Sequence, residues 1–381
     1  MGNMVYPKVH LAVDNCFAVK RWVRPRDWMK AIEEIGGIRL IQASTDNEID
    51  PAHNTQDFRD EWIDEVRQYE RQYGFKVVSF YSGYAQYRTV GIASHSRSKR
   101  NAMIELYFKP TVDAAARLGA QVGNTLGAFS EPVLEDPKEF VRAYKDVEDS
   151  LVYMTKYAGE KNVLFGYEQM YTPTQGMWTI NGCSEFIKHV SARANAPMYL
   201  TIDTAHQVGQ HMFIKPTVED IEAMQSNRSL RMSYLPAAIQ EPILNKENAK
   251  QIHLMLDKFD YWFAEPKDSD VYQWFSRLGC YSPIVHLQQT DGTYSSHKPF
   301  TAQYNKNGII RPKEVFAAIK ASYDNEEEAG MPPRVNDIYL AFEVFFSVMD
   351  ATDKIISDLR ESVEYWRKDM PRDGMRLDEL V

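Results

Sequence analysis

The feature that most constrains this chain is a repeated pair of segments, in which a short run rich in Val, Ile, Leu and aromatic residues precedes a longer amphipathic stretch. Such repetition is typical of strand-helix units around a parallel sheet. The pattern predicts eight strands, at Val9–Val13, Gly37–Gln42, Lys76–Tyr81, Ala120–Gly123, Val163–Glu168, Pro197–Asp203, Ile284–Gln288 and Asp337–Glu343. Because eight units close a barrel, we predict an α/β fold of the (β/α)8 TIM barrel type.

The 381 residues would also fit two average domains. No Pro- or Gly-rich linker or low-complexity tract divides the sequence, however, so residues 1–381 are predicted to form a single barrel domain. Within it, Pro137–Glu160 is predicted to be a helix that Asp136 caps, with Pro137 in the first turn and Glu139 completing a capping box.

The segment 207–283 breaks the even spacing, because it is far longer than one helix requires. We predict a helical insertion here, on the loop after the sixth strand. In a barrel such loops form the active-site face, which makes the insertion a candidate lid or subunit contact. A solvated excursion without a role is the alternative. Three helices are predicted within it, at Pro216–Gln225, Ala249–Phe263 and Asp268–Leu278.

Charge and cysteine content exclude several classes of protein. The net charge of −9 disfavours a nucleic-acid partner, because a phosphate backbone requires clustered Lys and Arg. Three dispersed cysteines without a CxxC spacing indicate neither a disulfide framework nor a zinc site. The first residues lack a signal-peptide pattern, and no apolar run would span a bilayer. We therefore expect a cytoplasmic protein without a membrane partner, and a homo-oligomer.

Polar residues at the carboxyl ends of four consecutive predicted strands are the candidate functional residues. Glu168, Asp203, His286 and Glu343 would converge on one mouth of a closed barrel. Three carboxylates and one imidazole suit a single divalent ion, Mn²⁺ foremost, with Mg²⁺ or Co²⁺ as alternatives. Taken singly, each residue could instead be an ion-pair partner, a helix cap or a hydrogen-bonded core histidine. Their joint position at adjacent strand ends favours the metal site.

These residues and their flanks resemble the xylose isomerase-like barrel superfamily, particularly its D-tagatose 3-epimerase-like sugar and sugar-phosphate isomerases and epimerases. The matching segments are Tyr167-Glu168, Asp203-x-x-His206, His286 followed by Asp291, and Phe342-Glu343. The resemblance implies that Glu168, Asp203, His286 and Glu343 hold one divalent metal. It also implies that His206 and the two glutamates face the substrate.

Two departures from that family bear on the substrate and the mechanism. Members that act on free ketoses place an Arg six residues after the seventh-strand His, where this chain has Gly292. Xylose isomerases proper have Glu-Pro-Lys-Pro at the fifth strand end, whereas this chain has Glu168-Gln169-Met170-Tyr171. A single-metal proton-transfer enzyme is therefore favoured over a two-metal hydride shift.

The resulting hypothesis is an isomerase or epimerase of a small keto sugar or keto sugar phosphate, acting by proton transfer through a metal-bound enediolate. Glu168 and Glu343 would exchange the proton, and His206 would bind a substrate oxygen. Trp178, Asp291 and Tyr171 are further substrate-site candidates. The resemblance favours 3-epimerisation of a tetrulose phosphate. A dehydratase or β-eliminating lyase on the same scaffold remains an alternative, as do, less favoured, an endonuclease-like hydrolase and a non-catalytic sugar-binding protein.

Weaker candidates surround this set. Asp14 and Asn15, the run 46–48 and the run 81–83 could line the mouth and bind hydroxyls, or could form ordinary solvated turns. A phosphate could be received by His297, Lys298 and Arg311 or by the loop 123–127, although ordinary surface charge is the simpler interpretation.

Overall fold

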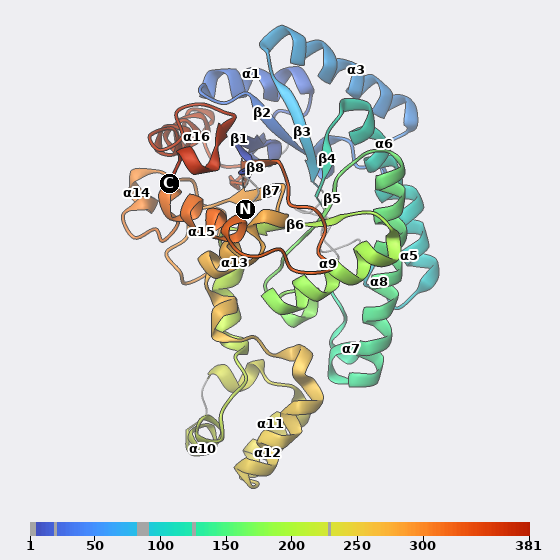
Figure 1. The fold of residues 1–381 in the computed structure, drawn as a ribbon, viewed down its shortest axis with the longest axis vertical. Coiled ribbons are helices and arrows are strands. Elements are labelled where there is room, and N and C mark those ends of the chain that lie inside the picture. Colours follow the sequence, from blue (N-terminus) through green and yellow to red (C-terminus); the bar gives the residue numbers. More distant parts are fainter. Residues whose placement is uncertain (1–4, 19–20, 82–90, 124–126, 228–229) are drawn as a thin grey trace.

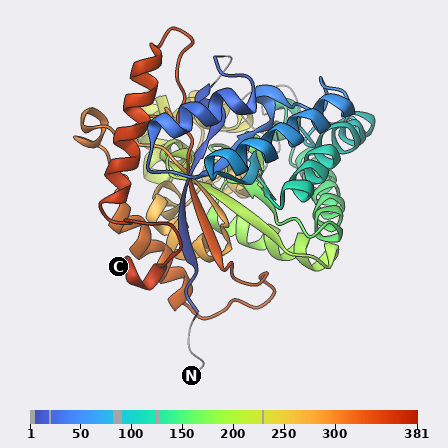
Figure 2. The ribbon, with the colours of Figure 1, turned by 90° about the horizontal axis from the view of Figure 1, so that it is seen from above.

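Eight parallel strands close into a barrel in a computed structural model that describes residues 5–18, 21–81, 91–123, 127–227 and 230–381. Each strand pairs with the next, and β8 and β2 both pair with β1, which completes the circle. Helices surround the strands (Figure 2). The predicted TIM barrel is therefore confirmed. The strands are β1 Lys8–Asp14, β2 Leu40–Ser44, β3 Lys76–Tyr81, β4 Gln121–Val122, β5 Phe165–Glu168, β6 Met198–Asp203, β7 Ile284–Leu287 and β8 Asp337–Phe342.

Helices follow the strands and cover the outside of the barrel (Figure 1). Their apolar faces pack on the strands, which are buried on both faces and therefore appear in the sequence as continuous apolar runs. The helices are α1 Pro25–Ile35, α2 Thr45–Glu48, α3 Gln56–Tyr73, α5 Arg97–Met103, α6 Lys109–Leu118, α7 Glu131–Glu135, α8 Pro137–Glu160, α9 Ile180–Ala194, α10 Val218–Ser226, α11 Ala237–Leu244, α12 Ala249–Met255, α13 Val271–Leu278, α14 Ala302–Asn305, α15 Pro312–Asp324 and α16 Thr352–Arg367.

Strand boundaries differ from the prediction by a few residues, for local reasons. β2 begins at Leu40 and not at Gly37, because Gly36 and Gly37 adopt positive φ angles of 77° and 68° and form a turn. Glu343 lies one residue beyond β8, yet its backbone N–H still donates to the Leu287 carbonyl at 3.1 Å. Its position is therefore fixed by the ladder between β7 and β8.

A short strand near the C-terminus, β9 Met375–Arg376, was not predicted. β1 pairs with β2 only from Ala12 to Asp14, which leaves the first half of that edge open. β9 fills it in antiparallel register with Lys8 and Val9. The C-terminal segment thus covers an edge that the stagger of the barrel would leave exposed.

The long segment between β6 and β7 contains two different parts. α10, α11 and α12 lie away from the barrel (Figure 1), and α11 was not predicted. α13, in contrast, packs against α15 and α9, as the crossover helix of a strand-helix unit should. The excursion is attached to the barrel through Tyr261, whose hydroxyl donates to the Leu134 carbonyl at 2.5 Å and whose ring stacks on Phe140.

No helix in the described part of the chain is both long and apolar enough to span a membrane.

The predicted helix Pro137–Glu160 is observed with the same bounds as α8. The Asp136 side chain accepts hydrogen bonds from the backbone N–H groups of Lys138 at 2.9 Å and Glu139 at 3.3 Å. The Glu139 carboxylate pairs with Arg142, so it does not form the predicted second half of a capping box.

We expect Asp136→Ala to lower the free energy of unfolding by about 1 kcal/mol, because two N–H groups of the first turn lose their acceptor. Asp136→Asn retains a cap acceptor and is the matched control. Chemical denaturation monitored by circular dichroism measures both. Equal stability of the Ala and Asn variants would contradict the capping role.

Candidate metal centre

The four predicted ligands meet at one end of the barrel. Glu168 and Asp203 are the last residues of β5 and β6, His286 is the third residue of β7, and Glu343 follows β8. Each offers a ligand atom, and these atoms all lie within 4.8 Å of one another. All four side chains are buried. The barrel thus assembles residues that are far apart in the sequence.

His286 lies between two of the acids. Its Nδ1 is 2.6 Å from Glu168 Oε1 and 3.3 Å from Glu343 Oε2. The Tyr81 hydroxyl donates to the other Glu168 oxygen, Oε2. Burial and the Glu168 charge raise the pKa of Tyr81 well above its ordinary value, so this hydroxyl remains a donor at neutral pH.

The Asp203 carboxylate is held by several donors. Its Oδ1 accepts the backbone N–H groups of Ala205 at 2.7 Å and His206 at 3.1 Å. The Gln288 amide Nε2 lies 2.8 Å from Oδ1 and 3.0 Å from Oδ2. These contacts fix the orientation of the carboxylate before any ligand binds, as supporting residues commonly do at metal sites.

Electrostatics in the site are dominated by burial and by the His286 charge. Burial would lower the pKa of His286, but Glu343 and Glu168 raise it well above its ordinary value. Burial would raise the pKa of Glu343, yet His286 and His297 lower it to about 2. Asp14, at the end of β1, has its pKa raised to about 8 by burial and by the Glu343 charge. Without a metal, the site is therefore an imidazolium held by carboxylates.

The donor set fits a divalent ion. Three carboxylates concentrated in a buried site repel one another unless a cation balances them, and one imidazole supplies only part of that charge. Glu343 Oε2 accepts no well-aligned hydrogen bond in the described part of the chain, although His286 Nδ1 lies 3.3 Å from it, so this oxygen is available to ligate a cation. Oxygen donors with one imidazole nitrogen suit Mn²⁺, Mg²⁺ or Co²⁺.

The structure places the other predicted site residues in two groups. His206 is buried beside the cluster, with Nε2 3.8 Å from Asp203 Oδ2, and the Tyr171 ring lies 3.9 Å from the His206 ring. Trp178 instead donates its indole N–H to the Tyr261 carbonyl of the excursion. Asp291 is exposed and accepts hydrogen bonds from Thr293. Of these four residues, His206 and Tyr171 lie beside the candidate ligands, and Trp178 and Asp291 contact other parts of the chain.

Sequence reasoning missed Gln288, weighed Asp14 and Tyr81 only as mouth residues that could bind hydroxyls, and weighed His297 only as a phosphate contact. Gln288 could have been found from strand alternation, because it lies two residues after His286 and shares its face. His297 Nδ1 is 3.4 Å from Glu343 Oε2, a contact created by a loop that returns to the mouth. No local signal in the sequence predicts that return.

The remaining weak candidates have other surroundings. Lys298 lies over the Tyr304 ring, and the exposed Arg311 lies 3.7 Å from Glu314. Asn15 Nδ2 donates to Glu48, and Asn47 Nδ2 donates to the Asn15 carbonyl. Positions 82, 83 and 124–126 of the predicted mouth and phosphate loops, like the side chain of position 46, lie outside the described residues.

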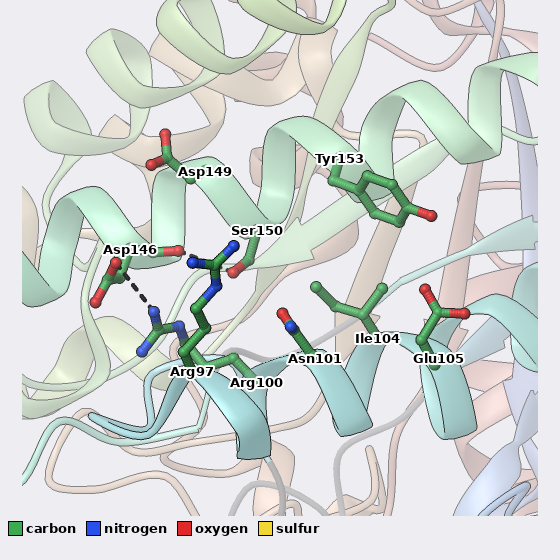
Figure 3. A pocket seen from close by; sticks show the side chains of 9 residues that line it. All are labelled: Arg97, Arg100, Asn101, Ile104, Glu105, Asp146, Asp149, Ser150 and Tyr153. Atoms are coloured by element: carbon green, nitrogen blue, oxygen red, sulfur yellow. Dashed lines mark hydrogen bonds and ion pairs between the residues drawn. The ribbon is translucent and has the colours of Figure 1, made fainter.

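Two pockets in the described part of the chain lie on the helical exterior, and neither is lined by the four candidate ligands. One, of about 540 Å³, lies between α5 and α8 (Figure 3), where Arg100 pairs with Asp146 at 3.0 Å. The other, of about 880 Å³, is lined by residues that include Glu48 and Trp62. Burial raises the pKa of Glu48 to about 8.

An eight-stranded barrel with buried carboxylates and an imidazole at the carboxyl ends of β5 to β8 defines a TIM barrel with a candidate metal centre. The family model described as xylose isomerase-like TIM barrel matches residues 29–325, and the chain belongs to this family.

Individual proteins are similar to parts or all of the chain. D-erythrulose 1-phosphate 3-epimerase of Brucella abortus (strain 2308) is 30% identical over 114 residues, a match covering 29% of this chain and 33% of that protein. A candidate xylose isomerase from Rhodospirillum rubrum has a TM-score of 0.69 at 16% identity, covering 94% of this chain and 99% of that one. An L-ribulose 3-epimerase has a TM-score of 0.54 at 14% identity, covering 95% and 93%. The structural matches show the shared fold.

We expect Mn²⁺ binding to release a proton at neutral pH. His286 is protonated in the metal-free site because its pKa is raised, and an imidazole must be neutral to ligate a metal. Metal affinity should therefore rise with pH, up to the pH at which His286 is already neutral in the metal-free protein. Calorimetry in buffers of different ionisation enthalpy measures the proton release. Binding with no proton release would contradict this protonation state.

Proposed function

We propose that this protein is a divalent-metal-dependent epimerase of a short ketose phosphate, and that it inverts carbon 3 of a tetrulose phosphate. The observation that carries the proposal is the buried grouping of Glu168, Asp203, His286 and Glu343. Similarity to a D-erythrulose 1-phosphate 3-epimerase supports the choice of reaction and substrate. The bound ion, Mn²⁺ in this proposal, would polarise a substrate carbonyl and make the neighbouring C–H more acidic.

Glu168 and Glu343 are the proposed acid-base pair. They extend from β5 and β8, and both approach His286 Nδ1, so they flank one common space. One carboxylate would remove the proton from carbon 3, and the other would return a proton to the opposite face of the same carbon. The configuration at that carbon is then inverted, with no net change in composition.

His206 is the proposed contact to a substrate hydroxyl. Its Nδ1 lies 2.8 Å from the Gln169 carbonyl, which can only accept a hydrogen bond. Nδ1 must therefore carry the hydrogen in the neutral ring, and Nε2 is left as an acceptor. The neighbouring Tyr171 ring would cover this side of the site and help to exclude water.

Epimerisation in D₂O should give product that carries deuterium at the inverted carbon. One carboxylate removes the substrate proton, and the other returns a hydrogen that it has taken from the solvent. Glu168→Gln and Glu343→Gln should each lower kcat by roughly 10²- to 10⁴-fold. Mass spectrometry and NMR of the product measure the label. Glu70→Gln, on α3 and retaining its acceptor for the Val77 N–H of β3, is the matched control. Unlabelled product would indicate an intramolecular transfer and contradict the pair.

Phosphorylated tetruloses should show a higher kcat/KM than the matching free sugars, because a charged end group supplies binding energy away from the reacting carbon. This expectation rests on Gly292, which stands where relatives acting on free ketoses have an Arg. Steady-state kinetics on matched pairs of D-erythrulose and its 1-phosphate decide it. Equal or faster turnover of the free sugar would contradict the phosphate assignment and leave the metal site untouched.

A further inference from the structure

The barrel interior below the candidate metal ligands is built from small and polar side chains. The odd-numbered strands contribute one layer made of Asp14, Tyr81, Glu168 and His286. Register places Gln42 beside Asp14, Thr201 beside Glu168 and Ala341 beside His286. With Gly123, these form the layer below. Two residues earlier on the odd strands come Ala12, Ser79, Gly166 and Ile284. Branched aliphatic residues usually fill such layers.

Several polar atoms in these layers lack a hydrogen-bond partner within the described protein. They are both amide atoms of Gln42, the hydroxyls of Ser79 and Thr201, Oδ2 of Asp14 and Nε2 of His286. All five residues are fully buried. Each buried polar group that stays unpaired costs about 1–3 kcal/mol. So many unpaired groups in one region indicate a shared partner that is not a side chain.

The Thr201 hydroxyl packs against the backbone of two glycines. A Cβ built on Gly123 would lie 3.3 Å from Thr201 Oγ1, and one built on Gly166 would lie 3.5 Å away. Both glycines therefore face the hydroxyl, and neither presents a side chain to it. Thr201 Oγ1 thus meets no side-chain donor or acceptor from these two positions.

We infer that this region, formed by Asp14, Gln42, Ser79, Thr201 and the Nε2 side of His286, binds a cluster of ordered water molecules. The unpaired atoms include both donors and acceptors, and water can satisfy both because it donates and accepts. The region contains no Lys or Arg that would hold an anion. Gln42, Ser79 and Thr201 lie one or two layers below the ligands, away from the barrel mouth at which a sugar would enter.

The water cluster would position His286 for metal binding, a role that rests on the proposed metal site. His286 Nδ1 faces Glu168 and Glu343, so Nε2 on the other side of the ring must carry the hydrogen when Nδ1 ligates. Metal-ligating histidines almost always donate that second N–H to a partner. None of the described residues accepts it here, and the bound water would do so. Gln42, Ser79 and Thr201 are then positioning residues.

High-resolution crystallography of the metal-free and Mn²⁺-soaked protein tests the cluster directly. We expect ordered water within hydrogen-bond distance of Thr201 Oγ1, the Gln42 amide and His286 Nε2 in both forms. Direct hydrogen bonds among these side chains, with no solvent density between them, would overturn the inference. This readout does not depend on metal binding or on the reaction catalysed.

Substitution tests the positioning role. Thr201→Val and Gln42→Met keep the volume and remove the polar atoms, so we expect the Kd for Mn²⁺ to rise about 10- to 100-fold. Thr201→Ser keeps the hydroxyl and should restore wild-type affinity. Thr155→Val is the matched control, because the Thr155 hydroxyl is also buried and unpaired but lies on α8.

The outcomes separate this inference from the proposed function. Unchanged affinity in folded Thr201→Val and Gln42→Met would overturn the positioning role, as would equal weakening by Thr155→Val. If both variants fail to fold, loss of affinity in Thr201→Ser would overturn it, because that variant retains the hydroxyl. Failure of the wild-type protein to bind Mn²⁺ would overturn the metal site, while the crystallographic result still decides whether the water is present.

Discussion

Repulsion among three buried carboxylates is the constraint to which the rest of this structure responds. Glu168, Asp203 and Glu343 have oxygens within 4.8 Å of the others and of His286, in a region with almost no access to solvent. Charges so close in a medium of low polarity strongly disfavour the ionised state unless a cation or donors compensate. His286 supplies one positive charge between two of them. The binding of an additional cation would therefore stabilise the ionised carboxylates.

The surrounding residues relieve that constraint by donating hydrogen bonds and by staying neutral. Tyr81 donates to Glu168, and Gln288 spans both oxygens of Asp203. Asp14, in the same layer as Glu168, has its pKa raised to about 8, so at neutral pH it adds little negative charge. Each contact comes from a different strand, which makes barrel closure a requirement for the electrostatics and not only for the fold.

The family match covers much more of the chain than the sequence similarity to a single epimerase does. The match to the xylose isomerase-like barrel extends over residues 29–325, whereas the similarity to a D-erythrulose 1-phosphate 3-epimerase covers 29% of the chain. The α10–α12 excursion is the part of the β6–β7 connection that lies away from the barrel (Figure 1). Tyr261 joins it to the α7 end through Leu134 and to Trp178. A change in the excursion would therefore reach the loop after β5 through packed side chains.

The sequence by itself determined the approximate strand positions and the four residues that meet at the candidate metal centre. Apolar runs mark strands because each strand is buried on both faces, and a polar residue at the end of such a run must lie at the barrel mouth. The strand Lys76–Tyr81 was predicted with its observed bounds for this reason, and the helix Pro137–Glu160 was predicted with its observed bounds from the cap at Asp136 and from Pro137 in the first turn. These signals are local, so they can be recognised in one segment without knowing which other segments pack against it.

Only the tertiary structure decided which other residues join the site. Asp14 and Tyr81 come from β1 and β3, so barrel closure decides that they meet the candidate ligands, whereas Gln288 shares the face of His286 within one segment. His297 reaches Glu343 because its loop folds back, with His297 itself at a φ of 48°. Trp178 faces the excursion and Asp291 faces Thr293, although both follow strands that carry ligands. Strand patterns fix where a residue lies along its own strand, whereas register and loop paths fix which residues of other strands it meets.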